Sequence, residues 1–76
     1  MTQKERVIEY ITEFGSISPM EAFRDLGITK LATVVSNLIR QDGVEIHKEY
    51  QQTKNRFGEP VYYMRYSFPK NENGIA

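Results

Sequence analysis

Apolar side chains recur at helical spacing near the start of the chain. The residues of this stripe are Val7, Ile8, Ile11 and Phe14. Thr2 followed by Glu5 is a capping-box pattern, in which the hydroxyl and the carboxylate each bond a backbone amide at the start of a helix. Gly15 is a typical residue just after the end of a helix. The pattern therefore predicts an amphipathic helix between Thr2 and Gly15.

A second, shorter helix is predicted over residues 19–26. Ser18 is a suitable N-cap, and Glu21 stands three residues later, which makes a second capping box. Pro19 occupies the first helical position, where its missing N–H costs nothing. Gly27 is expected to end this helix.

The third predicted helix spans residues 30–41 and follows a turn of three residues, with Thr29 as its expected N-cap. At about 100° per residue, its apolar side chains gather on one face. They are Leu31, Val34, Val35, Leu38 and Ile39. The opposite face carries the polar residues Thr33, Ser36, Asn37 and Arg40, with Lys30 at its edge. We expect the apolar face to enter the core and the polar face to meet water or a partner.

The pattern then changes to the alternation that is typical of strands. The inward positions of a first strand are predicted to be Val44, Ile46 and Tyr50. A second strand is predicted from Val61 to Phe68. Its inner face is expected to carry Tyr62, Met64, Tyr66 and Phe68, and its other face Val61, Tyr63, Arg65 and Ser67. The connection over residues 51–60 is longer than a usual hairpin loop, so we expect an antiparallel hairpin with a long tip.

The predicted order is three helices followed by a two-stranded antiparallel β-hairpin wing. The second and third helices are joined by a short turn that contains glycine. This order is the winged helix-turn-helix arrangement. The predicted fold class is therefore α+β. A chain of 76 residues has room for one domain, which we expect to span residues 1–69. Residues 70–76 are polar and without pattern, and we expect them to form a disordered C-terminal tail.

Two segments also resemble a known family. They are GSISPMEAFRDLGITKLATVVSNLIRQDG and TKNRFGEPVYYMRYSF, and they are similar to the small helix-turn-helix domain proteins of phages and prophages. In that family a segment of the form SIT-x-x-EA-x-x-DLGI-x-(K/R)L precedes a hairpin bearing NRFGE. The resemblance covers Thr2 to about Phe68 and implies a winged helix-turn-helix fold. The chain departs from the family at Thr33, Asn37 and Ile39, where members tend to carry additional arginines.

Helix-turn-helix proteins place the second helix of the unit in the major groove, where its outward side chains meet base edges. Arginine can bind guanine there, asparagine can pair with adenine, and hydroxyl groups can bond either base. The candidate DNA contacts on this helix are Lys30, Thr33, Ser36, Asn37 and Arg40. At the hairpin tip, Lys54, Asn55 and Arg56 are expected to reach phosphates or the adjacent minor groove. The alternative for all these residues is a surface that is merely solvated.

The charge distribution says more than the total charge. Ten basic and ten acidic residues give zero formal net charge, which does not by itself indicate a nucleic-acid ligand. However, residues 30–41 and 51–58 each contain two basic residues and no acidic one. Three glutamates, Glu5, Glu9 and Glu13, lie on the first predicted helix. We therefore predict a dipolar molecule whose third helix and wing are positive.

Two functions fit these observations. The favoured one is sequence-specific binding of double-stranded DNA by a phage or prophage regulator, as a homodimer or with a partner protein on DNA. The exposed tyrosines Tyr10, Tyr50 and Tyr63 could form such an interface or could simply cover a thin core. The alternative is a winged-helix protein–protein interaction module that docks on a host complex and has little DNA affinity. Zero net charge and the few arginines of the third helix favour this alternative.

Enzymatic chemistry is not expected, because the chain has no phosphate-binding glycine run and no recognisable nucleophile motif. His47 is the sole histidine, and with Glu45 and Glu49 beside it the ligands are too few for a metal site. We expect His47 to pair across the sheet with Arg65 or Tyr63, or to face solvent. No cofactor, metal or small-molecule substrate is predicted.

The expected localisation is cytoplasmic. The chain has no cysteine, so nothing indicates an oxidising compartment. Its apolar runs fall short of the roughly 20 residues that span a membrane. The first residues enter a charged amphipathic pattern directly, without the apolar core of a signal peptide.

Overall fold

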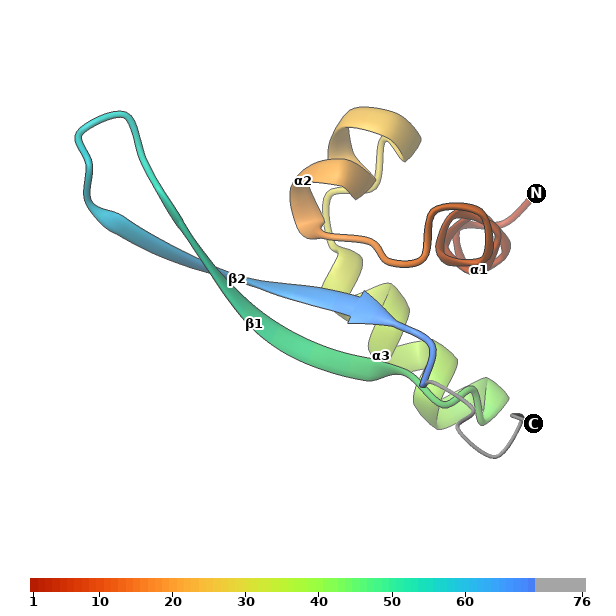
Figure 1. Ribbon diagram of the computed structural model, residues 1–76. Coiled ribbons are helices and arrows are strands. Elements are labelled where there is room, and N and C mark those ends of the chain that lie inside the picture. The colour runs from red at the N-terminus through yellow and green to blue at the C-terminus, as the bar shows by residue number, and fades with distance from the viewer. Residues whose placement is uncertain (70–76) are drawn as a thin grey trace.

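The computed structural model describes residues 1–69, and the predicted tail over residues 70–76 lies outside the described residues. Helical segments form a body, and a hairpin projects from it (Figure 1). The helical elements are α1 (Gln3–Phe14), α2 (Pro19–Glu21), η1 (Ala22–Leu26) and α3 (Leu31–Asp42), and the strands are β1 (His47–Lys54) and β2 (Pro60–Ser67). The predicted α+β class and the order of three helices followed by a hairpin are confirmed.

The capping box predicted at the start of α1 is present. The Glu5 amide donates to Thr2 Oγ1 at 3.2 Å, and the Thr2 amide donates to Glu5 Oε1 at 2.8 Å. Gly15 ends the helix with a φ of 92°, a left-handed conformation that glycine adopts without strain. Phe14, the last residue of the predicted apolar stripe, is 63% exposed. Phe14 is the last residue of the helix, and its ring packs against Tyr10 with centroids 4.7 Å apart, outside the core.

The second helical segment has the predicted bounds but changes geometry along its length. Ser18 and Glu21 form the predicted capping box at the start of α2. From Ala22 the chain widens into the π-helical turn η1, and the Gly27 amide donates to the carbonyls of Ala22 and Phe23. Gly27 then ends the segment with a φ of 71°. Turns of this kind are short insertions into otherwise regular helices.

The third helix starts one residue later than predicted. Lys30, not Thr29, is the N-cap residue, because the amides of Thr33 and Val34 donate to the Lys30 carbonyl. No side-chain hydrogen bond caps this helix, so the role predicted for the Thr29 hydroxyl is wrong. The helix also continues to Asp42 before Gly43 ends it with a φ of 67°.

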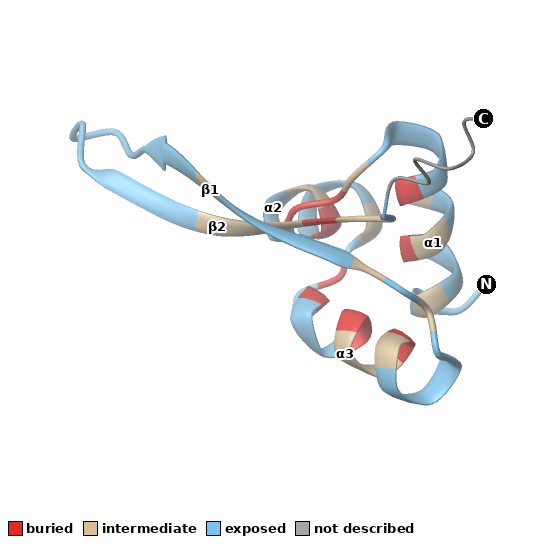
Figure 2. Ribbon diagram, turned by 60° about the horizontal axis from the view of Figure 1, so that its bottom comes forward, coloured by how far each residue is buried: buried red, intermediate tan, exposed pale blue. Residues whose placement is uncertain are grey.

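The core is one small cluster to which the helices and the hairpin both contribute (Figure 2). Its buried members are Val7, Ile11, Ile17, Ala22, Ile28, Leu31, Val34, Val35, Leu38 and Tyr66. The predicted apolar face of α3 is confirmed for Leu31, Val34, Val35 and Leu38, and Ile39 packs partly buried against the cluster. Among the described residues, no buried side-chain nitrogen or oxygen lacks a hydrogen-bond partner.

We call the antiparallel hairpin of β1 and β2 the wing. At its base His47 lies opposite Ser67, next to the body of the domain. Ile17, between α1 and α2, bridges to Tyr66 through two backbone hydrogen bonds of 2.8 and 2.9 Å. Because the Tyr66 side chain is also buried, this bridge attaches the wing to both the backbone and the core of the body.

The first strand of the wing is displaced toward the tip relative to the prediction, the second begins and ends one residue earlier, and the loop is shorter. β1 begins at His47 instead of Val44 and continues to Lys54, which leaves only residues 55–59 for the turn. Cross-strand hydrogen bonds hold this outer part of the hairpin, so it needs no apolar alternation to form.

The outer half of the wing extends beyond the core and is exposed (Figure 2). The inward positions predicted for Tyr50 and Tyr62 are therefore wrong, since these residues are 73% and 64% exposed. The prediction holds at the base, where Tyr66 is 6% exposed and both Met64 and Phe68 pack partly buried against the core.

Candidate nucleic-acid interface

The polar face of α3 lies opposite the buried residues of the same helix. Thr33 and Arg40 are exposed, and Ser36 and Asn37 are half-buried along the side of the helix. Lys30, at the N-cap, is exposed as well. The side-chain hydrogen bonds and ion pairs within residues 1–69 involve none of these five residues, whereas Asp42, the last residue of the helix, is paired with Lys4. The face predicted from the sequence is thus available to a ligand.

An ion pair holds the C-terminal end of α3 against α1. Lys4 Nζ lies 3.0 Å from Asp42 Oδ2 and donates to Gln41 Oε1 at 2.8 Å. Asp42 brings an acidic residue into a helix that was predicted to contain none. Because Lys4 neutralises that carboxylate, the negative charge of Asp42 does not offset the cations of the polar face.

The turn at the wing tip is organised by Asn55. Its Oδ1 accepts hydrogen bonds from the amides of Phe57 and Glu59 at 2.9 and 3.0 Å. Its Nδ2 donates to Glu59 Oε1 at 3.0 Å, and its backbone amide donates to the Glu59 carbonyl. Both polar ends of the Asn55 side chain are therefore bonded within the turn. The structure gives Asn55 a structural role, while Lys54 and Arg56 beside it are exposed.

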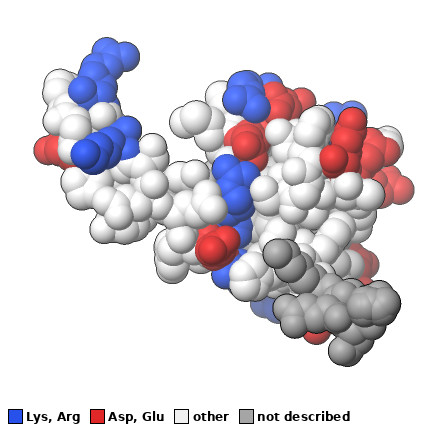
Figure 3. Space-filling view, viewed as in Figure 1, with Lys and Arg blue, Asp and Glu red and all other residues white. Residues whose placement is uncertain are grey.

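Charged side chains are unevenly distributed over the face of the molecule shown in Figure 3. Basic side chains gather at the far end of the wing, and acidic groups gather on the opposite side of the body, over the helices. The charged residues at the tip are Lys54, Arg56 and Glu59. The tip is therefore basic, but it includes Glu59, which lies just outside the acid-free range of residues 51–58. On this face the wing tip forms a basic end, whereas basic and acidic side chains lie side by side over parts of the body.

Arg65 holds the base of the wing against α2. Its Nη1 donates to Ser16 Oγ at 2.9 Å and to Glu21 Oε1 at 3.1 Å. Its Nε donates to Gln51 Oε1 at 2.9 Å, and the Tyr63 hydroxyl donates to the same oxygen at 3.0 Å. The guanidinium carbon also lies 5.7 Å from the centroid of the Tyr63 ring. These contacts fix the direction in which the wing leaves the body.

The sequence did not reveal this network. Arg65 was offered as a cross-strand partner of His47, but the structure places Ser67 opposite His47 and leaves His47 exposed. The pairing with Arg65 is wrong, and the alternative, that His47 faces solvent, is confirmed. The one available signal was the alternation of β2, which puts Arg65 on the side opposite the buried Tyr66.

Two hollows lie beside these elements. A groove of about 610 Å³ separates α2 from the wing, and its apolar lining includes Met20, Val61 and Tyr63. Arg24 and Arg65 also line it. Met20 is 75% exposed, so the groove presents an apolar side chain to solvent.

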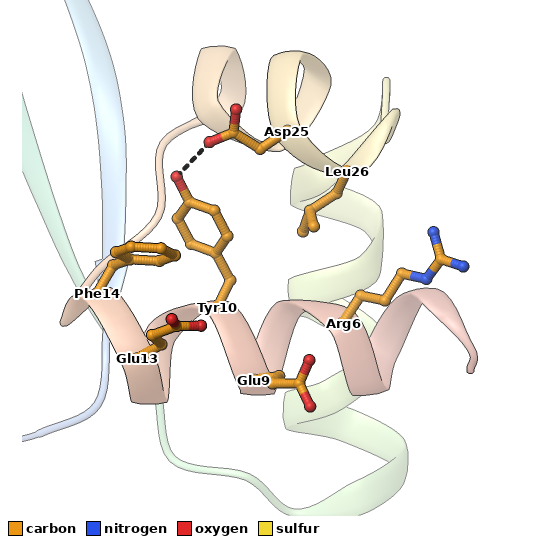
Figure 4. Close-up of a pocket in the computed structure, with 7 residues that line it drawn as sticks. All are labelled: Arg6, Glu9, Tyr10, Glu13, Phe14, Asp25 and Leu26. Carbon is orange, nitrogen blue, oxygen red and sulfur yellow. Dashed lines mark hydrogen bonds between the residues drawn. The ribbon is translucent and has the colours of Figure 1, made fainter.

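The second hollow, of about 260 Å³, lies between α1 and η1 (Figure 4). The Tyr10 hydroxyl donates to Asp25 Oδ2 at 2.6 Å, and Arg24 bonds both oxygens of the same carboxylate at 2.8 and 2.9 Å. The hydrogen bonds from Arg24 and then from Tyr10 lower the pKa of Asp25 to about 2. In turn, the bond to Asp25 raises the pKa of Tyr10. The polar groups of Tyr10, Arg24 and Asp25 bind one another through these hydrogen bonds. Their role beside the hollow is therefore to join α1 to η1.

Metal chemistry finds no support within residues 1–69, where no group of three or more histidine, cysteine, aspartate or glutamate side chains could hold a metal ion. In the same part of the chain, the structure contains no helix that is long and apolar enough to span a bilayer.

Comparisons with known proteins agree with the fold. A family model described as a winged helix-turn-helix domain matches residues 2–71, which includes every helix and strand of the structure. Searches of curated proteins and of solved structures found no match. Domains of this kind suggest DNA binding in general and are typically not enzymes. The chain therefore belongs to the family of winged helix-turn-helix domains.

Proposed function

We propose that this protein binds double-stranded DNA through the polar face of α3 and the basic tip of the wing. The observation that carries the proposal is the set of five polar or basic side chains on and beside α3 that have no partner within residues 1–69. They stand on a helix whose opposite face is fixed in the core, so a ligand meets them in a defined arrangement. The family points to DNA as the ligand.

The α3 side chains have the chemistry for base and backbone contacts. With α3 in the major groove, Arg40 can fork onto guanine and Asn37 can pair with adenine. Thr33 and Ser36 can donate to or accept from either base or phosphate. Lys30, at the start of the helix, adds a cation for a phosphate. This division gives the helix both sequence-reading and positioning contacts.

The wing adds contacts at a distance from α3. Lys54 and Arg56 are exposed at the tip and are proposed to meet the DNA backbone or the adjacent minor groove. Asn55 is left out of the proposed contacts, because the turn already uses its side chain.

The small size of the proposed interface limits the affinity of a single copy for DNA. One copy would make about four to six phosphate contacts, so its affinity should fall steeply with salt. A second copy, or a partner protein, would supply the additional contacts that a specific site requires. The sequence resemblance to small phage proteins makes a phage or prophage regulator the proposed role.

The test is a fluorescence-anisotropy titration of labelled duplex DNA at low and at moderate salt. We expect binding at low salt, and we expect Arg40→Ala and Arg56→Ala each to weaken it with little change in thermal stability. Each variant removes one cation, so each should also reduce the slope of log affinity against log salt by about one.

The matched control is Arg6→Ala, which removes an exposed arginine from α1, away from the proposed surface. Its duplex affinity should equal that of the unmodified protein. Absence of duplex binding at low salt would overturn the proposal. An equal loss of affinity in all three variants would show that only the total charge matters, and it would remove α3 and the wing tip from the interface.

A protein–protein interaction module remains the second candidate, because the groove between α2 and the wing exposes apolar side chains. Met20, which lines the groove, is 75% exposed, and Phe23, on the same helical segment but outside the groove lining, is 63% exposed. Apolar surface of this kind often marks a protein contact. If duplex DNA does not bind, Met20→Ser and Phe23→Ser should leave the fold intact while weakening capture of a protein partner.

A further inference from the structure

The two faces of the wing differ in chemistry. The register places one exposed set of residues on a common face, which we call the tyrosine face: Lys48, Tyr50, Gln52, Lys54, Pro60 and Tyr62. This face has two lysines, two tyrosines and no acidic residue. The other face carries Glu49, and its Arg65 is committed to Glu21 of α2. The wing is thus asymmetric across its thickness.

The tyrosine face is not explained by the stability of the fold. It continues outward from Met64 and Tyr66, which belong to or pack against the core, but Tyr50 and Tyr62 are 73% and 64% exposed. Aromatic side chains prefer burial, and the core lies only at the base of the wing. Two large rings are therefore held in water on a hairpin.

The placement of these rings suits a row of bases. Tyr50 lies opposite Met64 and Tyr62 lies opposite Gln52, so the two tyrosines are diagonal neighbours on one face, about 7–8 Å apart. Exposed aromatic rings beside cations are the usual surface for single-stranded nucleic acid, because each base offers a ring for stacking and each phosphate a negative charge. Lys48 and Lys54 stand at the two ends of the row.

The two lysines and the absence of acid on this face favour a polyanion over a basic or neutral ligand, and the exposed rings favour a polyanion that carries bases. A duplex keeps its base faces stacked inside the helix, so only an unpaired strand presents them to a protein ring. The major-groove contact proposed for α3 does not use this face.

We propose that the tyrosine face binds an unpaired strand of DNA, with bases stacked on Tyr50 and Tyr62 and phosphates on Lys48 and Lys54. This inference rests on the proposed function in that it takes nucleic acid as the ligand. It extends that function from duplex to unpaired DNA and assigns the unpaired strand to the tyrosine face, which shares Lys54 with the proposed duplex interface.

The first measurement is the affinity for a labelled oligothymidine at low salt. Tyr50→Ala and Tyr62→Ala should each weaken binding by about fivefold or more, the effect of removing one base–aromatic stack. Tyr50→Phe and Tyr62→Phe keep the ring and should bind as the unmodified protein does. Thr53→Ala is the matched control, because Thr53 is an exposed residue of β1 on the other face.

The second measurement separates stacking from charge. An oligomer of the same length with abasic sites keeps the phosphates but removes the bases, so it should bind more weakly than oligothymidine. The protein has no tryptophan, so its emission comes from tyrosine. Oligothymidine should quench part of that emission, and the double variant Tyr50→Phe/Tyr62→Phe should lose this quenching while it retains affinity.

Two results would overturn the inference. One is equal affinity for the abasic oligomer and oligothymidine, since this would reduce the contact to charge alone. The other is a protein that sediments as a dimer and becomes a monomer in Tyr50→Ala or Tyr62→Ala, since a second copy would then cover the face. An oligouridine that binds as tightly as oligothymidine would support base stacking and show that the sugar is not read.

The α3 variants distinguish this inference from the proposed function. If Arg40→Ala weakens duplex binding while the tyrosine variants leave oligothymidine binding unchanged, the proposed function stands and the stacking surface fails. If the tyrosine variants lose oligothymidine and duplex DNA does not bind, the stacking surface stands and the duplex interface fails.

Discussion

Buried side chains carry unusual weight in a domain with so small a core. Leu38 is 1% exposed and lies in the middle of α3, where it packs within the only cluster of buried residues in the described part of the chain. The same helix presents Thr33 and Arg40 to solvent. A single helix therefore holds the residues that stabilise the body and those proposed to contact DNA, and substitutions can separate the two roles.

Leu38→Ala should lower the free energy of unfolding by about 2–5 kcal/mol, because it removes buried methyl groups and leaves a cavity. Thr33→Ala, on the exposed face, should change it by no more than about 0.5 kcal/mol. Urea denaturation followed by circular dichroism measures both. Equal unfolding midpoints for the two variants would contradict the orientation of α3 described here.

Neighbouring residues at the wing tip show what a sequence cannot specify. Asn55 and Arg56 both belong to a short polar segment that was predicted to contact DNA. In the structure, the Asn55 side chain makes three hydrogen bonds within the turn, whereas Arg56 is exposed. The difference depends on the position of Glu59 in the folded turn, which residue type and spacing do not give.

At the scale of the elements, the hydrogen bond from the Tyr10 hydroxyl to Asp25 joins α1 to η1. The Asp25 carboxylate is ionised in this contact, and its pKa is lowered from 3.8 to about 2 by Arg24 and by Tyr10. A lowered pKa means that the folded chain binds this proton less readily than the unfolded chain does. The resulting stabilisation is complete above the unfolded value and is lost as the pH falls through the folded value.

We therefore expect the free energy of unfolding to decrease as the pH is lowered from about 5 towards 2. Asp25→Asn should make this decrease shallower, and Tyr10→Phe, which removes one of the hydrogen bonds, should have a smaller effect in the same direction. Urea titrations at a series of pH values test the order of the three proteins. Parallel curves for all three would show that this contact does not contribute to acid stability.

Local signals predicted the helices well because the residues that begin and end them act over a few positions. The capping boxes at Thr2 and Ser18, and the glycines that follow the helices, lie next to the backbone groups that they satisfy. The wing was predicted less well, because strand pairing over residues 51–54 depends on a partner across the hairpin. The exposure of Tyr62 was missed for a related reason, since alternation does not show where the core ends.

The candidate site was predictable only in part, because some of its contacts join residues that are far apart in the chain. The polar face of α3 follows from helical periodicity and lies where it was predicted. By contrast, Arg65 contacts Glu21 and Ser16, which are 44 and 49 residues away in the chain. No local pattern links these residues, so the network that orients the wing becomes visible only in the folded structure.

The described molecule as a whole combines a packed body with a projecting wing, and its longest dimension is 42 Å. The wing is attached at its base by the Ile17–Tyr66 bridge and by the ion pair of Arg65 with Glu21. Beyond that point the strands depend on each other alone, because their side chains are largely exposed. Stability should therefore decline from the base of the wing to its tip.

Hydrogen exchange measured by NMR tests this gradient. We expect the amides of Ile17 and Tyr66 to exchange more slowly than the cross-strand amides nearest the turn. Arg65→Ala should accelerate exchange at the base of the wing while it leaves the buried amides of α1 and α3 unchanged. Uniform exchange along the hairpin would mean that the wing opens as a single unit.

The one-sided pairing of β1 has a consequence for solubility. Within residues 1–69, β1 pairs with β2 only, so its other edge presents free backbone groups there, and residues 50–53 along that edge carry no charge. An edge of this kind can recruit a strand from another molecule and start aggregation. Glu49 and Lys54 flank the uncharged stretch, with Lys48 one residue further along β1, and lysine on an edge strand opposes such pairing. We therefore expect Lys48 and Lys54 to oppose strand pairing between the β1 edges of neighbouring copies of the protein.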